Sequence, residues 1–210
     1  MSYAQNLWFY FVLLSGIIIV PGMDMLFVLT NSLTGGRKLG LAAVAGITAG
    51  GVVHNIFGVI FVGTVSTMPP LFFKLILVCG SLYMAWIGYG LVKSSIFVDH
   101  VAKGIAKSYW VAFRQGAITC LTNPKASAFM LAVFPNFIKL QYGNVWMQGL
   151  IMAIMTSFLQ IAIYGGFALA AHHSRDALIS HKNTTIWVSR LVGVFFIAVA
   201  TYSLFHGFTK

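Results

Sequence analysis

The stretch GIIIVPGMDMLF, residues 16–27, places a proline, a glycine and an acid inside an otherwise apolar run. A second stretch, ITCLTNPKASAF at 118–129, places a proline and a lysine inside another apolar run. The two prolines, Pro21 and Pro124, lie 103 residues apart in a chain of 210. Because proline has no backbone N–H and its ring disturbs the preceding turn, each stretch predicts an interrupted helix.

The composition around these two stretches is that of a membrane protein. The chain is 59% apolar and 8% charged, and its mean hydropathy is +0.89. Soluble domains carry about 25% charged residues, so a water-exposed surface is excluded. A span of the hydrocarbon core needs about 20 apolar residues. We therefore predict an all-α integral membrane protein with six transmembrane helices, near 7–33, 39–66, 72–92, 115–138, 145–171 and 187–207.

The net charge of +10 follows the topology rather than a polyanionic partner. With six spans, one face receives nine basic residues, which are Arg37, Lys38, Lys93, Lys103, Lys107, Arg114, Arg175, Lys182 and Arg190. The other face receives Lys74, Lys139 and Lys210. This asymmetry in short loops is the positive-inside bias. It predicts that both termini are non-cytoplasmic and gives no support to nucleic-acid binding. The first helix has no basic n-region and is predicted to be retained.

The spacing of the prolines predicts two halves of opposite orientation. A shift of 103 residues places the first helix on the fourth, and 39–66 on 142–169. Three helices is an odd number, so two such units in series insert as inverted repeats with broken first and fourth helices. The single domain 1–210 then comprises repeat one (about 1–92), a cytoplasmic linker (93–114) and repeat two (about 115–210). Inverted repeats with broken helices at matching places point to a transporter binding site.

The second break, Asn123-Pro124-Lys125, has the residues that begin a helix. Asparagine is a favoured N-cap, and proline suits the first helical position. A half-helix that begins here directs its free N–H groups and positive dipole end toward the membrane interior, which favours an anion. Lys125 adds a full positive charge. The break therefore predicts a site for a carboxylate.

The first break, Pro21-Gly22, places Asp24 in the first turn of the restarted helix. If ionised, Asp24 suits an ammonium group; if protonatable, it suits coupling to protons. The two breaks together predict a site for the two ends of a zwitterion. A charge at the bilayer centre costs about 2.5–3.5 kcal/mol on insertion scales. Charged residues at this depth are therefore not expected without a function or a partner. A purely structural Asp24–Lys125 ion pair is the alternative.

Other polar residues in the predicted spans are weaker candidates. His54 and Asn55 lie midway along the second helix and either line a cavity, with a role in proton transfer, or bond to neighbouring helices. Gln160 and Tyr164 lie one turn apart and either face the substrate or join helices.

Cofactor and enzyme chemistry find little support in the motifs. Cys79 and Cys120 show no CxxC spacing, and a membrane thiol–disulfide relay that uses them is the alternative function. His172 and His173 have no matching ligands, so no metal site and no cofactor is predicted. No Walker motif is present, which argues against ATP hydrolysis. No recognisable motif surrounds a serine nucleophile, which argues against an intramembrane hydrolase.

The ordered motifs resemble the LysE/RhtB family of amino-acid exporters. The matching segments are Pro21-Gly22-Met23-Asp24-Met25-Leu26, Asn31-Ser32, Gly35-Gly36-Arg37, Gly40-Leu41-Ala42-Ala43, Phe113-Arg114-Gln115-Gly116 and Asn123-Pro124-Lys125. The resemblance runs from about residue 10 to 206. It implies a small six-helix protein of the bacterial inner membrane that exports amino acids and is not an enzyme. Met23 stands where the family often has proline, and Gly51 where an acid is frequent.

These observations predict a secondary exporter of a small zwitterionic or cationic amino acid or related metabolite. The predicted site residues are Asp24, Asn123, Lys125, His54, Asn55 and Gln160, with Pro21, Gly22 and Pro124 at the helix breaks. The expected partners are the substrate, the lipid bilayer and protons as the coupling ion. A homo-oligomer is left open.

Overall fold

The computed structural model describes residues 2–65, 70–93, 108–171 and 182–208, and every regular element within them is helical. The α-helices are α1 (Tyr3–Ile19), α2 (Met23–Gly35), α3 (Arg37–Val65), α4 (Pro70–Lys93), α5 (Tyr109–Thr122), α6 (Pro124–Ala128), α7 (Val145–Leu169) and α9 (Lys182–Phe208). A π-helical segment η1 (Phe129–Val133) and two 3₁₀ turns, η2 (Phe134–Asn136) and η3 (Leu140–Tyr142), connect α6 to α7. The all-helical prediction is confirmed.

Two bends interrupt the chain at the proline motifs. Helix α1 ends before Pro21, and α2 leaves it at an angle of 52°. Helix α5 ends before Asn123, and the segment that begins at Pro124 turns by 49°. Pro124 occupies the first turn of α6, where its missing N–H has no partner to lose. The covalent geometry of proline thus sets where both helices stop.

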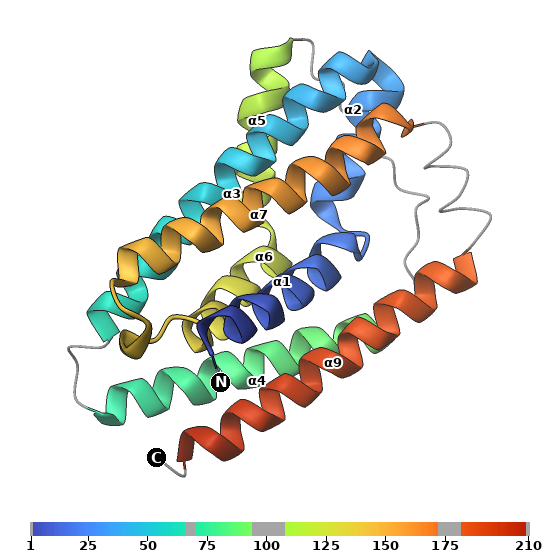
Figure 1. Ribbon diagram of the computed structural model, residues 1–210. Helices are drawn as coiled ribbons and strands as arrows, with labels where there is room; N and C mark the ends of the chain where they lie inside the picture. Colours follow the sequence, from blue (N-terminus) through green and yellow to red (C-terminus); the bar gives the residue numbers. More distant parts are fainter. Residues whose placement is uncertain (1, 66–69, 94–107, 172–181, 209–210) are drawn as a thin grey trace.

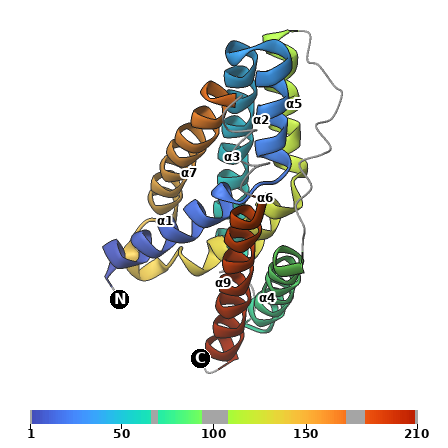
Figure 2. The same ribbon diagram turned by 90° about the vertical axis from the view of Figure 1, so that its right-hand side faces the viewer.

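The helices form two groups with the broken segments between them (Figures 1 and 2). Helix α3 packs along α5 and α7, and α2 packs on α3. Helices α4 and α9 run side by side and form the second group. Helix α4 also contacts α6 and η1. Helices α1 and α6 lie between the two groups. The breaks therefore lie in the middle of the molecule.

Glycines set two of the close helix contacts. A Cβ atom added to Gly46 of α3 would collide with the Phe113 carbonyl oxygen of α5. A Cβ atom on Gly88 of α4 would lie 2.7 Å from the carbonyl oxygen of Gly193 of α9. Small residues at such positions let membrane helices approach closely, which gains van der Waals contact where no water is present to drive association.

Some of the described helices are long and apolar enough for membrane spans. Among the described residues, α3 and α7 meet this condition on their own, and up to four spans result when each bent pair counts as one. Large apolar side chains cover the outer faces, among them Trp8, Phe57, Trp86, Trp110 and Phe158. Six spans in two inverted repeats stay a prediction. Helix α5 begins at Tyr109, earlier than the predicted span, and residues 94–107 of the predicted linker lie outside the described residues.

Candidate functional site

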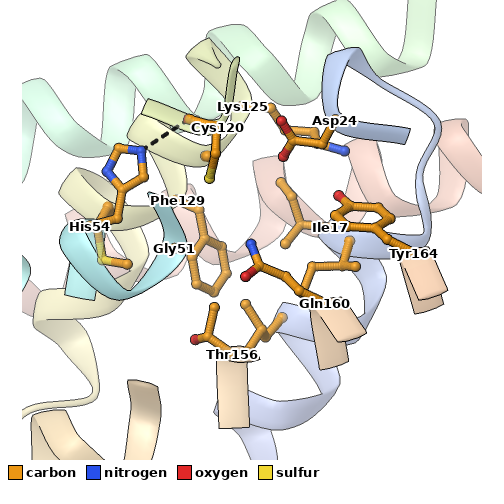
Figure 3. A pocket seen from close by; sticks show the side chains of 14 residues that line it. Ile17, Asp24, Gly51, His54, Cys120, Lys125, Phe129, Thr156, Gln160 and Tyr164 are labelled. Atoms are coloured by element: carbon orange, nitrogen blue, oxygen red, sulfur yellow. Dashed lines mark hydrogen bonds between the residues drawn. The ribbon is translucent and has the colours of Figure 1, made fainter. Parts of the chain in front are cut away.

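The two helix breaks meet at one pocket (Figure 3). Asp24, from the first turn of α2, is 3% exposed and lines it. Lys125, from the first turn of α6, lines the same pocket and is half-buried. A carboxylate and an ammonium from opposite halves of the chain therefore share one space, enclosed by apolar side chains.

Lys125 also completes the end of α1. Its Nζ donates a hydrogen bond of 2.7 Å to the carbonyl oxygen of Val20, the residue just before Pro21. Carbonyl groups at a helix C-terminus have no partner within the helix, and that end carries a partial negative charge. The lysine of one half thus stabilises the interrupted helix of the other. A Cβ atom on Gly22 would lie 3.1 Å from Nζ, so glycine leaves room for the ammonium.

Asp24 and Lys125 do not form an ion pair in the described structure, although they share the pocket. Within the described residues, Oδ1 of Asp24 has no hydrogen-bond partner. The same holds for Nδ2 of Asn123, whose Oδ1 caps α6 by accepting from the Lys125 backbone N–H at 3.0 Å. Both atoms are buried. Because an unsatisfied buried polar atom costs free energy, these two are candidates for contact with a ligand.

The structure separates the two polar neighbours on α3. His54 lines the pocket, and its Nε2 lies 3.1 Å from the carbonyl oxygen of Cys120 on α5. Since a carbonyl oxygen accepts only, Nε2 carries the proton. Asn55 is 1% exposed and donates from Nδ2 to the Gly51 carbonyl oxygen of its own helix at 2.8 Å. Of this pair, His54 alone lines the pocket.

One face of α7 contributes three polar side chains to the pocket. Thr156, Gln160 and Tyr164 are spaced four residues apart, which places them on the same side of the helix. Gln160 is 5% exposed, and its Oε1 has no partner in the described structure. The sequence interpretation named Gln160 and Tyr164 but missed Thr156. The four-residue spacing was the signal that could have found it.

Apolar side chains form the walls between these groups. They come from the end of α1 (Leu14, Ile17 and Ile18) and from the π-helical segment (Phe129 and Met130). The volume that the centre of a water molecule can occupy is about 40 Å³. One water needs about 10–15 Å³ of such volume, so the pocket in this conformation admits only a few small atoms.

The cysteines and histidines support no other chemistry in the described structure. Cys79 is exposed, Cys120 is buried, and both are free thiols. Among the described residues, no cluster of histidine, cysteine and acidic side chains has the arrangement of a metal site. His172 and His173 lie outside the described residues.

Comparison with known proteins identifies relatives along most of the chain. The family model described as LysE type translocator matches residues 15–207. A homoserine/homoserine lactone efflux protein of Salmonella typhimurium is 27% identical over 165 residues, 78% of this chain and 80% of that protein. A leucine efflux protein of Enterobacter sp. is 27% identical over 196 residues, 93% of each chain. No solved structure matches significantly. These matches give no support to a thiol–disulfide relay.

Proposed function

Because the chain belongs to the LysE type translocator family, we propose that it is a secondary transporter that exports a small amino acid or related metabolite. The export runs across the bacterial inner membrane and is coupled to the proton gradient. The single observation that carries this proposal is the pocket at the two breaks, where Asp24 of one half and Lys125 of the other face a common space. Relatives named for homoserine and leucine efflux support an amino acid as the cargo.

The substrate ammonium binds Asp24 and the substrate carboxylate binds Lys125. An ammonium carries three N–H donors, and Lys125 uses one of them on the Val20 carbonyl oxygen. The others remain for a carboxylate. A structural ion pair is the weaker alternative, because the Asp24 Oδ1 atom is not engaged by Lys125 in the described structure. Asn123 Nδ2, which is buried without a hydrogen bond in the described structure, is a further donor at the second break.

Protons couple to transport through the pocket's titratable side chains. Asp24 is a buried acid that either holds the substrate ammonium or takes a proton in its place. A carboxyl that exchanges these two ligands links release of the amino acid to uptake of a proton, because burial makes a bare carboxylate unfavourable. His54 lines the same pocket and is the second candidate for a role in proton transfer.

Replacement of Asp24 by asparagine tests the proposal. Asp24→Asn keeps the shape of the side chain and removes its charge, so the protein inserts normally and loses export. Efflux of labelled amino acids from cells that overexpress each form measures this, after a toxicity screen has found an amino acid or analogue that the wild type helps the host to tolerate. The control is Asn136→Asp, which alters charge outside the pocket. Undiminished efflux by Asp24→Asn contradicts the assignment.

A further inference from the structure

The polar groups of the pocket are unevenly placed along its length. In Figure 3, Asp24 and Lys125 lie at one end and Thr156 at the other, with Gln160 and Phe129 between them. Thr156 and Gln160 are one turn apart on α7, which corresponds to about 6 Å along the helix axis. When the pocket opens to hold an amino acid at the charged end, the rest of the pocket leads toward Thr156. That end of the pocket meets the part of the substrate that differs between amino acids.

The hydroxyl of Thr156 uses most of its hydrogen-bonding capacity within the protein. Its Oγ1 donates to the Met152 carbonyl oxygen at 2.8 Å. Its single proton is used there, so the Tyr10 hydroxyl, 3.2 Å away, must be the donor in their shared hydrogen bond. Tyr10 is fully buried. Thr156 thus has no donor left for an anion and at most one lone pair left for a hydroxyl group.

The charges that line the pocket match a substrate with one charge of each sign. Asp24 is the one acid in its lining, and Lys125 is the one lysine. A second ammonium, as in a basic amino acid, would find no carboxylate at the Thr156 end. A second carboxylate would meet no second lysine or arginine in the lining, where Gln160 and Tyr164 offer only neutral donors. His54 already donates to the Cys120 carbonyl oxygen. An unpaired charge in such a site is strongly disfavoured.

We propose that the pocket selects amino acids with a short uncharged side chain, aliphatic or hydroxylated, and that Thr156 sets this specificity. This inference rests on the proposed function and adds the substrate class to it. The aliphatic part of the side chain contacts Ile17, Phe129 and Met130. Thr156 accepts a hydrogen bond from a side-chain hydroxyl when one is present. Basic and acidic amino acids are rejected because their extra charge has no partner.

Counterflow in proteoliposomes with the purified full chain tests this inference. Wild type loaded with leucine takes up labelled leucine. Unlabelled leucine, homoserine and threonine compete at least about tenfold better than lysine or glutamate, since an unpaired charge carries a large cost. Equal competition by lysine overturns the inference while the proposed function stands. Absence of counterflow with any of these amino acids contradicts the proposed function itself.

Variants that change the specificity provide a second, more discriminating experiment. Thr156→Asp places an acid at the side-chain end, so the ratio of lysine to leucine transport rises at least about tenfold over wild type. Ser157→Asp carries the same charge on the same helix and does not line the pocket, so it leaves the ratio unchanged. Thr156→Val, which keeps the shape, retains leucine transport and loses competition by homoserine relative to leucine. An unchanged homoserine-to-leucine ratio in Thr156→Val overturns the role of Thr156, even if Thr156→Asp fails to fold.

Discussion

At the scale of single residues, Lys125 has two roles that one side chain performs together. Its ammonium satisfies the Val20 carbonyl oxygen at the end of α1, and the same ammonium faces the pocket that Asp24 lines. In the proposed function, a substrate carboxylate would meet a cation that is already held in place by the end of α1. Fixing the donor before binding reduces the conformational entropy that binding would otherwise cost.

Replacement of Lys125 by methionine should separate these two roles. Lys125→Met leaves the Val20 carbonyl oxygen without a partner, which destabilises the protein by about 1–3 kcal/mol. It also removes the partner of the substrate carboxylate, so the variant no longer prefers an amino acid over its carboxamide. Thermal unfolding in detergent and competition by the two compounds measure these effects. Lys139→Met, which alters an exposed lysine, is the control. A preserved preference for the free carboxylate argues against the assignment.

At the scale of helices, the packing of α3 on α5 fixes the second break. Gly46 of α3 meets the backbone of α5 at Phe113, and Gly50 meets it near Cys120. Further along, His54 of α3 binds the Cys120 carbonyl oxygen, one turn before Asn123. The same carbonyl oxygen also accepts from the Asn123 backbone N–H at 3.2 Å, so His54 adds a second, interhelical hydrogen bond at the end of α5. Helix α3 thus supports the break as well as lining the pocket.

Substitution of Gly46 by alanine should therefore disturb the α3–α5 interface. The added methyl group collides with the Phe113 backbone of α5, and overpacking of this kind costs about 1–3 kcal/mol. Gly166→Ala on α7 is the matched control, because nothing lies within 4 Å of the added Cβ atom. The control should gain up to about 1 kcal/mol from helix propensity. Unfolding temperatures in detergent compare the two; equal stability of both variants would show that α3 and α5 are further apart.

At the scale of the whole molecule, an aromatic cluster lies on one side of the pocket. Helix α1 begins and α9 ends at the same end of the molecule (Figure 1). Between that end and the pocket, Tyr10 packs against Phe129, Phe134 and Phe137 with ring centroids 5.4–6.3 Å apart. The four rings form one packed aromatic cluster. In the proposed cycle, release toward this end requires the half-helices α1 and α6 to separate.

The orientation of the molecule in the membrane can be tested with reporter fusions. Helices α3 and α5 begin at the end opposite the start of α1 (Figure 1), and basic residues lie near their starts. From the positive-inside bias we expect both chain termini outside the cytoplasm. Alkaline phosphatase fused after Lys210 should be active and a fluorescent protein there dark, with the reverse after Lys93. A fluorescent fusion at Lys210 contradicts this orientation.

The sequence by itself determined the helical class, the membrane setting, the positions of the breaks and the presence of an acid and a lysine next to them. These features are local, because hydropathy follows composition and a proline interrupts a helix through its own covalent structure. That Asp24 and Lys125 lie close together was a hypothesis based on the two predicted inverted repeats. Only the tertiary structure placed both side chains at one pocket.

Tertiary structure decided which other polar residues line that pocket. His54 lines it and Asn55 does not, because adjacent helical residues point about 100° apart and the packing of α3 selects one of them. Thr156 and its partner Tyr10 lie 146 residues apart in the chain, and Val20 and Lys125 lie 105 apart. No local pattern specifies such pairs. They arise when helices from both halves pack together, since each buried polar group must then find its hydrogen-bond partner across the interface.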